Sequence, residues 1–394
     1  MSNNSSERKR SEGEGGLGNR VAGISTHHSR DALIDALRGI CVASMLIKHL
    51  GAGDFASRMS LSGSVGFFSG AEGFFFLSGF IFSRVYRRRT ETKGPAVATR
   101  LMLKRWFHIY SMHFLCVAAA CACAPLMPAA FLGLKEDYAL FVNSPIKAFF
   151  LGSALIYQPH MLGIVPMYLV FIPIAGGLIL RGWERSHWVP LVAILLWALQ
   201  LGEVRAHLDV FTAGNRISML AAYQMLFFVG TWIGSQSLEK PVIRVHPALA
   251  LLCVAVVGGC FVALHPRYFG LNQATVDAMT AGPSDKLSMG WLRVLNFSAA
   301  AYLVYYYSSP LRKLPLAMFA ALGRNSLGIF VGHIVFTYVF CQVNLVILGV
   351  GQMVYNFFIM SCLAVMAVAL WQPKLPGAAQ RGQPKGSNPN DCDR

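Results

Sequence analysis

Long apolar runs, separated by short polar and basic segments, dominate the chain from residue 33 to residue 371. A helix needs about 20 apolar residues to cross a bilayer, and continuous runs that do not alternate argue against strands. The pattern therefore predicts an all-α polytopic membrane protein with about ten transmembrane helices. We expect the spans at about 33–51, 62–83, 106–124, 166–181, 187–202, 220–236, 246–265, 292–309, 318–341 and 351–371.

The stretch 145–165 is apolar, but proline and polar residues interrupt it. We expect it to be an interfacial or re-entrant segment. If it crosses the membrane instead, the number of spans rises by one and the C-terminus changes sides. The longest predicted external segment, about 125–165, is a candidate lid over the outer face.

The two ends of the chain differ from the apolar middle. Residues 1–30 and 373–394 are rich in small, polar and charged residues, which predicts disordered cytoplasmic tails on either side of one membrane domain, 31–372. No cleavable signal is expected, because Arg38, Lys48 and His49 lie inside the first apolar run.

The charge distribution indicates the orientation. Only 13% of the residues are charged, and the formal net charge is +16. In a soluble protein this excess would suggest nucleic acid, but the positive-inside rule explains it better, so no nucleic-acid partner is expected. Segment 84–105 alone contains eight Lys or Arg, whereas the predicted external segments contain few for their length. Both termini are therefore predicted to be cytoplasmic.

Ionisable residues within the first span are the strongest sign of function. Arg38 and His49 are eleven positions apart, which at 100° per residue is three turns plus about 20°. Both side chains should lie on one helix face, roughly 16 Å apart along the axis. Asp35 is three residues before Arg38 and close enough to pair with it. A juxtamembrane ion pair plus a buried histidine is the simpler interpretation; a polar path into the membrane is the functional one.

Glu72 lies in the apolar sequence GFFSGAEGFFFLSGF of the second span. A carboxylate in such surroundings is costly unless it has a partner. It is either a snorkelling or neutral glutamate, or a partner that orients His49 or stabilises the protonated histidine. Ser78 and Gly79 are interpreted as a site of close helix contact rather than as a nucleophile.

Three further groups are candidates for substrate binding. Arg105 and Tyr110 lie in KRWFHIYSMH, followed by His113; the basic end could hold phosphates, or Lys104 and Arg105 could only determine topology. Ser326 and His333 are seven residues apart on one face of the ninth span, with Arg324 at its start, and Ser326 could equally be an N-cap. Gln224 is either a sugar contact or an interhelical hydrogen bond.

The sequence contains no Gly-rich phosphate loop, HExxH or zinc pattern. We therefore expect neither a metal nor a permanently bound cofactor.

The order of these motifs resembles a known family. The segment RDALIDALRGICVASMLIKHL followed by AEGFFFLSGF is similar to the opening of the acyltransferase-3 superfamily of membrane O-acyltransferases. The likeness is closer to the OpgC family, because RVYRRR, KRWFHIYSMH, VPMYLVFIP, AYQMLFFVG and LGRNSLGIFVGH follow in that family's order, over about residues 30–370. The chain departs from the family pattern at SMLAAYQ, where Asn-Pro is usual before an aromatic-Gln pair.

The resemblance implies an enzyme of the bacterial inner membrane that moves an acyl group from cytoplasmic acyl-CoA to a periplasmic glucan. Succinyl-CoA is the implied co-substrate and a glucan hydroxyl the acceptor. His49 becomes the catalytic histidine and Arg38 its motif partner. The remaining matching positions become pocket candidates: Asp35, Glu72, Arg105, Tyr110, Arg324 and His333.

Two mechanisms and a second class of function remain open. His49 can act as a general base, or it can form a covalent acyl-histidine. Alternatively, the buried charges line the path of a transporter or flippase for an acidic or sugar-bearing solute, which should show paired breaks at mid-membrane. Pro173, Gly176 and Gly177 are expected to break the fourth span, and no partner break is evident. A purely structural scaffold leaves the buried charges unexplained.

Overall fold

The computed structural model describes residues 31–50, 58–128, 138–158, 161–200, 217–237, 245–340, 360–362 and 365–366. Its contacts divide the chain after Asp31, and all described helices belong to the unit that starts at Ala32. Both predicted tails, and most of the predicted tenth span, lie outside the described residues.

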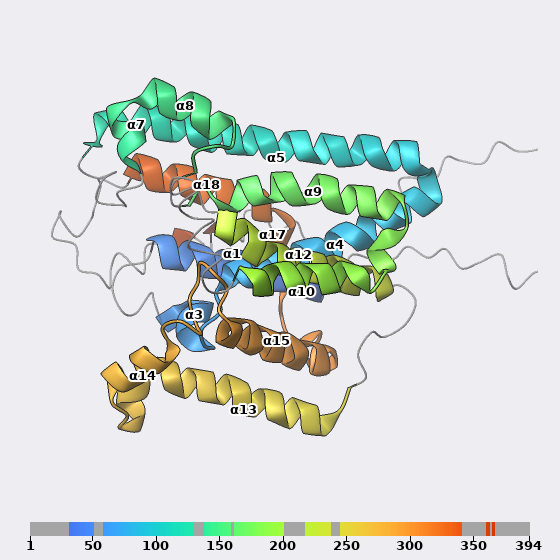
Figure 1. Ribbon diagram of the computed structural model, residues 1–394, viewed down its shortest axis with the longest axis vertical. Coiled ribbons are helices and arrows are strands. Elements are labelled where there is room, and N and C mark those ends of the chain that lie inside the picture. Colours follow the sequence, from blue (N-terminus) through green and yellow to red (C-terminus); the bar gives the residue numbers. More distant parts are fainter. Residues whose placement is uncertain are drawn as a thin grey trace, which may run out of the picture. The chain divides into compact units, whose positions relative to one another are not determined.

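Every regular element of the described part is a helix, which confirms the all-α prediction (Figure 1). The longer helices are α1 (Ala32–Leu50), α4 (Gly70–Lys93), α5 (Pro95–Cys123), α9 (Ile164–Leu180), α10 (Trp188–Leu199), α12 (Ile217–Gln236), α13 (Pro247–Leu264), α15 (Trp291–Tyr306) and α18 (Ser326–Phe340). The short ones are α3 (Leu61–Ser64), η1 (Ala124–Leu126), α7 (Ala139–Asn143), α8 (Pro145–Ser153), η3 (Trp183–Arg185), η4 (Pro266–Phe269), α14 (Gln273–Thr280), α16 (Ser308–Leu311) and α17 (Ala317–Arg324).

Three predicted spans differ from the helices observed. The second was expected at 62–83, but α3 ends at Ser64 and α4 begins only at Gly70, where the Glu72 carboxylate accepts a hydrogen bond from the Ser69 backbone at 2.9 Å. The third starts at Pro95 rather than 106, directly after Gly94, whose φ of 81° ends α4. The ninth consists of α17 and α18, which are bent by 77° at Asn325.

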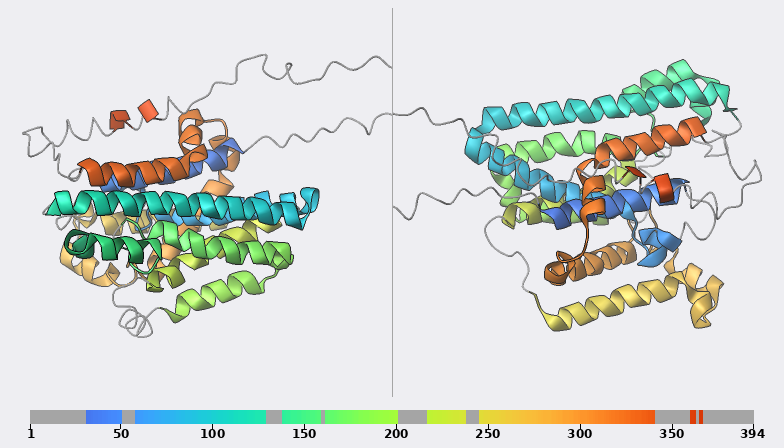
Figure 2. Two further views of the ribbon diagram at one scale, coloured as in Figure 1. Left: turned by 90° about the horizontal axis from the view of Figure 1, so that it is seen from above. Right: turned by 180° about the vertical axis from the view of Figure 1, so that it is seen from behind.

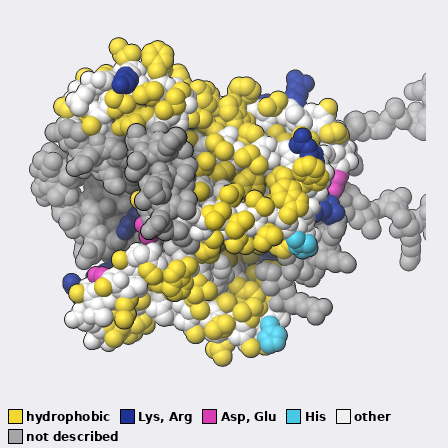
Figure 3. All heavy atoms as spheres, in the orientation of Figure 1, with side chains coloured by type: hydrophobic (Ala, Val, Ile, Leu, Met, Phe, Trp, Pro, Cys, Tyr) yellow, Lys and Arg dark blue, Asp and Glu magenta, His cyan; other side chains and the backbone are white. Residues whose placement is uncertain are grey.

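Membrane length was tested on the described residues only. Two helices are long and apolar enough to cross a bilayer, Pro95–Leu126 and Pro247–Leu264, and the bent pair α17–α18 would make a third. The count of ten spans therefore stays a prediction. Figure 3 shows hydrophobic side chains over most of the described part of one face, with several Lys and Arg side chains at the end where α4 and α5 join.

Small residues let α4 and α12 lie side by side (Figure 1). A Cβ atom at Gly79 would collide with the backbone oxygen of Phe227, and one at Gly230 or Gly234 would collide with Phe76 or Phe80. The close helix contact predicted for Gly79 is thus confirmed. Phe76 lies next to Gly230, and Phe80 lies next to Gly234. The two helices therefore run in the same direction, as predicted for the second and sixth spans.

The helix α9 runs unbroken through Pro173, Gly176 and Gly177, so the predicted break is wrong. Proline lacks an N–H and leaves the carbonyl four residues earlier without its helical partner. That carbonyl belongs to Leu169, and it accepts a hydrogen bond from the Trp106 indole of α5 at 2.8 Å. A neighbouring helix therefore supplies the missing donor, a compensation that the sequence of α9 alone does not show.

Helices α8 and α9 both pack against α5, at different points along its length, and the views of Figure 2 show them beside it. Cys121 Sγ of α5 donates to Pro145 O at the start of α8, and Tyr110 OH donates to Ser153 O at its end. Further along α5, Trp106 contacts Leu169 of α9. The nine residues of α8 rise about 14 Å, so α8 by itself is too short for a bilayer crossing. That the stretch 145–165 is interfacial or re-entrant stays a prediction.

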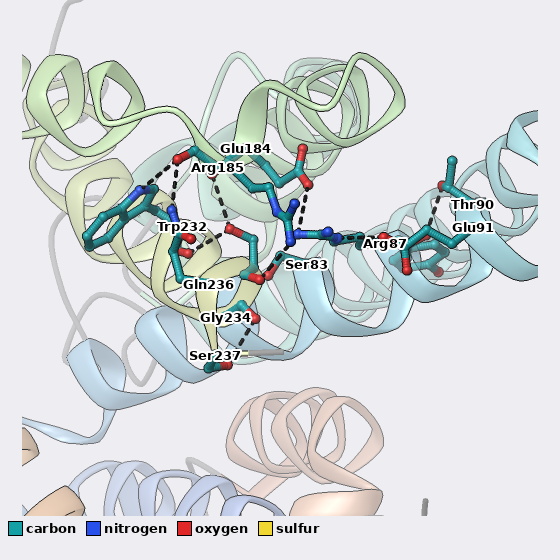
Figure 4. Close-up of polar contacts among 12 residues, drawn as sticks. Ser83, Arg87, Thr90, Glu91, Glu184, Arg185, Trp232, Gly234, Gln236 and Ser237 are labelled. Atoms are coloured by element: carbon teal, nitrogen blue, oxygen red, sulfur yellow. Dashed lines mark hydrogen bonds and ion pairs between the residues drawn. The ribbon is translucent and has the colours of Figure 1, made fainter. Parts of the chain in front are cut away.

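Polar contacts tie the end of α4 to the turn between α9 and α10 (Figure 4). Arg87 pairs with Glu91 at 2.8 Å, lies 3.9 Å from the Glu184 carboxylate and donates to Ser235 O of α12. Trp232 and Gln236 of α12 donate to Arg185 O. Burial raises the pKa of the Glu184 carboxyl, because desolvation outweighs the opposing effect of Arg87.

Candidate functional site

Arg38 of α1 lies against the start of α18. Its guanidinium donates a hydrogen bond to Ser326 Oγ at 2.7 Å, and its Cζ lies 5.6 Å from the centroid of the Phe74 ring of α4. Ser326 is buried. An arginine held against an aromatic face and a hydroxyl keeps a fixed direction, which suits binding of an anionic group.

His49 of α1 contacts His333 of α18, the helix that also carries Ser326. His49 Nδ1 and His333 Nε2 lie 2.9 Å apart, and the rings stack with centroids 5.2 Å apart. His333 is buried and His49 half-buried. One hydrogen is shared between the two nitrogens, so one ring is the donor and the other the acceptor.

These two contacts define how α1 and α18 are arranged. Arg38 precedes His49 as Ser326 precedes His333, so the helices run in the same direction, as predicted for the first and ninth spans. Arg38 and His49 both contact α18, as expected for two side chains on one face of α1. The site thus joins Arg38, His49, Ser326 and His333.

Close backbone packing holds α1 beside α17, directly before α18. A Cβ atom at Gly39 would collide with Phe319 O, and one at Gly323 would collide with the backbone oxygen of Asp35. The Asp35 side chain is buried, one turn before Arg38.

Glu72 does not orient His49, which corrects that part of the sequence interpretation. Its carboxylate pairs with Arg293 of α15 at 2.7 Å, and its other oxygen accepts from Ser69. Its side chain is fully buried, and the Arg293 cation at contact distance offsets the cost of burying the carboxylate. Arg293 was not among the residues predicted for the site, although an arginine within the predicted span 292–309 carries the same signal as Arg38.

Four other candidates form no hydrogen bond with His49 or His333 in the described part of the chain. Gln224 Nε2 donates to Ala193 O of α10 at 2.7 Å, so the interhelical hydrogen bond is present. Tyr110 donates to Ser153 O at 3.1 Å. Arg105 is half-buried and Arg324 exposed, and neither has an ion-pair partner among the described residues. Their roles in substrate binding stay predictions.

The arrangement of the histidine pair allows proton transfer. When His49 Nδ1 carries the shared hydrogen and donates it to His333 Nε2, the lone pair of His49 lies on Nε2. Only this tautomer makes His49 Nε2 a base. A partner that fixes the tautomer and the direction of a histidine is what general-base catalysis requires.

Comparison with known proteins identifies the class of protein. A family model described as OpgC protein matches residues 30–375. The chain belongs to the OpgC family, which points to an acyltransferase that acts in glucan modification. The family and the apolar helices together indicate a membrane protein. No curated protein and no solved structure matches the chain.

Proposed function

We propose that this protein is a multi-pass enzyme of the bacterial inner membrane that transfers an acyl group from cytoplasmic acyl-CoA to a hydroxyl of a periplasmic glucan. Succinyl-CoA is the proposed donor. The observation that carries the proposal is the 2.9 Å contact between His49 Nδ1 and His333 Nε2. It gives a protonatable group a fixed orientation within a chain of a family that points to acyl transfer.

In the proposed step, His49 Nε2 removes the proton of the acceptor hydroxyl while the hydroxyl oxygen attacks the thioester carbonyl carbon. The new C–O bond forms, the C–S bond breaks, and the coenzyme A thiolate leaves. The imidazolium of His49, held through Nδ1 by His333, then returns its proton to the thiolate. Atoms and charge balance, and both histidines end neutral.

Two arginines are proposed to hold the donor. Arg38 lies at the predicted inner end of α1, and its guanidinium is directed by Ser326 and Phe74. Arg105 lies on α5 without an ion-pair partner among the described residues. Guanidinium groups match phosphate and carboxylate geometry, so these residues suit the coenzyme A phosphates or the succinyl carboxylate.

The test is thioester turnover by the purified protein in the presence of a glucan, with succinyl-, acetyl- and longer-chain coenzyme A donors compared. Succinyl-CoA should react fastest, with release of free thiol and labelling of the glucan. The His49→Ala variant should lose transfer by about 10²-fold or more while its thermal unfolding stays that of a folded protein. Full activity of that variant would reject the mechanism.

The covalent alternative has its own readout. If the acyl group passes through His49, protein incubated with labelled succinyl-CoA and no glucan should hold label that His49→Ala lacks. Direct transfer leaves both proteins unlabelled.

A further inference from the structure

An open groove of about 320 Å³ lies between α13, α15 and the end of α3, three helices that Figure 1 shows on the same side of the molecule. Its walls are formed by Val254, Val257 and Phe261 of α13, Ser64 and Val65 at the end of α3, and Leu303 of α15. The hydroxyl of Ser64 donates to Ser60 O within its own turn. These walls therefore suit an apolar ligand of small-molecule size.

The groove follows the axis of α13. Val254, Val257 and Phe261 are separated by three and four residues, so they lie on one face of the helix and span about 10 Å of its length. α13 is one of two described helices that are long and apolar enough to cross a bilayer. A ligand that fills the groove lengthwise would therefore run parallel to the acyl chains of the surrounding membrane.

The packing of α13 is sparse around this groove. Ala250 and Cys253 pack with Ala299 and Tyr302 of α15 in a small cluster that is separate from the main hydrophobic core. Protein interiors are close-packed, and the walls of an unfilled gap lose dispersion contacts. An apolar chain in the groove would supply these contacts between α13 and the rest of the protein.

A cation lies near one end of the groove. The Phe261 ring contacts the His265 ring with centroids 4.7 Å apart, and His265 Nε2 donates to Gly63 O at 2.8 Å, which ties the end of α13 to α3. The Tyr268 ring lies 5.8 Å from the His265 ring, and Arg58 Cζ lies 5.6 Å from the Tyr268 centroid. Arg58 and Tyr268 are both exposed. Tyrosine is enriched at membrane interfaces, and arginine attracts anionic headgroups.

We propose that this groove is a binding site for an anionic phospholipid. One acyl chain lies along Val254, Val257 and Phe261, and the headgroup phosphate lies near Arg58 at the end of α13. The charge of Arg58 and the apolar walls together select a lipid, because a sugar or a free anion would leave the groove unfilled. The proposal goes beyond acyl transfer and depends only on the membrane setting of the protein.

The first experiment blocks the groove. A Cβ atom at Gly258, which also lines it, or at the neighbouring Gly259 would meet no atom, and leucine favours a helix, so both leucine variants should fold. Native mass spectrometry of the purified full-length protein with added phosphatidylglycerol measures the bound lipid. Gly258→Leu should bind it about tenfold more weakly than wild type. Gly259→Leu is the matched control, because Gly259 is not among the lining residues, and it should bind as wild type.

The second experiment tests the headgroup. Wild type should retain phosphatidylglycerol better than zwitterionic phosphatidylcholine. Arg58→Gln should weaken phosphatidylglycerol binding about tenfold and leave phosphatidylcholine binding unchanged. Arg100→Gln removes an exposed arginine of α5 and should bind both lipids as wild type.

Three results would overturn the proposal. Equal lipid binding by Gly258→Leu and Gly259→Leu would show that the groove does not hold the acyl chain. Equal retention of the two lipids by wild type would show that the charge of the headgroup is not recognised. A dimer in the wild-type spectrum that only Gly258→Leu abolishes would show that a second copy of the chain occupies the groove.

Discussion

The carboxylate of Glu72 and the guanidinium of Arg293 lie 2.7 Å apart in the interior of the protein, where each neutralises the other. Arg293 Nε also donates to Ser284 O, and Glu72 accepts from the Ser69 backbone. The pair therefore fixes the first turn of α4 to the first turn of α15 and to the segment before it.

Glu72→Gln should destabilise the protein by about 3–5 kcal/mol, because it leaves the Arg293 cation buried without a counter-charge. The double variant Glu72→Gln/Arg293→Met should recover much of this loss, since no charge is then buried alone. Thermal unfolding of the purified protein measures both effects. Glu91→Gln on the same helix is the control. The Glu91 carboxylate, which pairs with Arg87, is exposed, so this substitution should change the free energy of unfolding by at most about 0.5 kcal/mol. Equal losses from the single and double variants would contradict the role of this pair.

The two substitutions of His333 should differ in their effect on transfer. Gln can place an oxygen near the position of Nε2 and accept from His49 Nδ1, so His333→Gln should retain part of the activity. His333→Leu provides no acceptor and should lower kcat by about 10²-fold with the KM for acyl-CoA nearly unchanged. The readout is steady-state thiol release. If His333→Leu changed only KM, the residue would be a binding group and not the partner of His49.

Adding one methyl group at Gly39 should be costly. An alanine there would collide with Phe319 O of α17, and such overpacking costs about 1–3 kcal/mol. Gly332→Ala is the matched change on α18, where no atom lies near the new Cβ, and it should be neutral or stabilising by about 0.5–1 kcal/mol. Thermal unfolding of the two variants should therefore shift in opposite directions. Similar shifts would show that α1 and α17 are not in close contact.

The stability of the protein should fall as the pH rises past the range where Glu184 ionises. Burial raises the pKa of this carboxyl above its ordinary value of 4.5, so the folded state holds the proton more tightly than the unfolded state. The stabilisation is complete below pH 4.5 and is lost as the pH rises through the folded-state pKa. Glu184→Gln should therefore unfold at a higher temperature than wild type at neutral pH, with the difference shrinking in acid. A constant difference across the pH range would contradict the shift.

Periodicity and length predicted most of the helices, because apolar runs report directly on burial or lipid contact. The bounds of α1, α9, α10, α13 and α15 lie within a few residues of those expected. The start of α4 was missed, although Ser69 and Glu72 have the spacing of a helix N-terminus. The continuity of α9 could not be read from its own sequence, because the partner of the carbonyl that Pro173 leaves free lies on α5.

The spacing of Arg38 and His49 correctly placed both on one face of α1, since helical geometry alone determines which side chains align. What the two residues contact could not be derived in the same way. The partner of His49 was sought on the adjacent second span, and the hydrogen bond is made to α18 instead. Buried charge pairs are equally hard to assign, because any buried cation could satisfy Glu72 and only the fold selects Arg293.

His49 and His333 are 284 positions apart in the chain. The ribosome therefore completes α1 long before α18 exists, so His49 acquires its contact with His333 only late in synthesis. A chain that ends after α15 does not contain this histidine pair. The histidine pair therefore exists only in a chain that contains both the first described helix and α18.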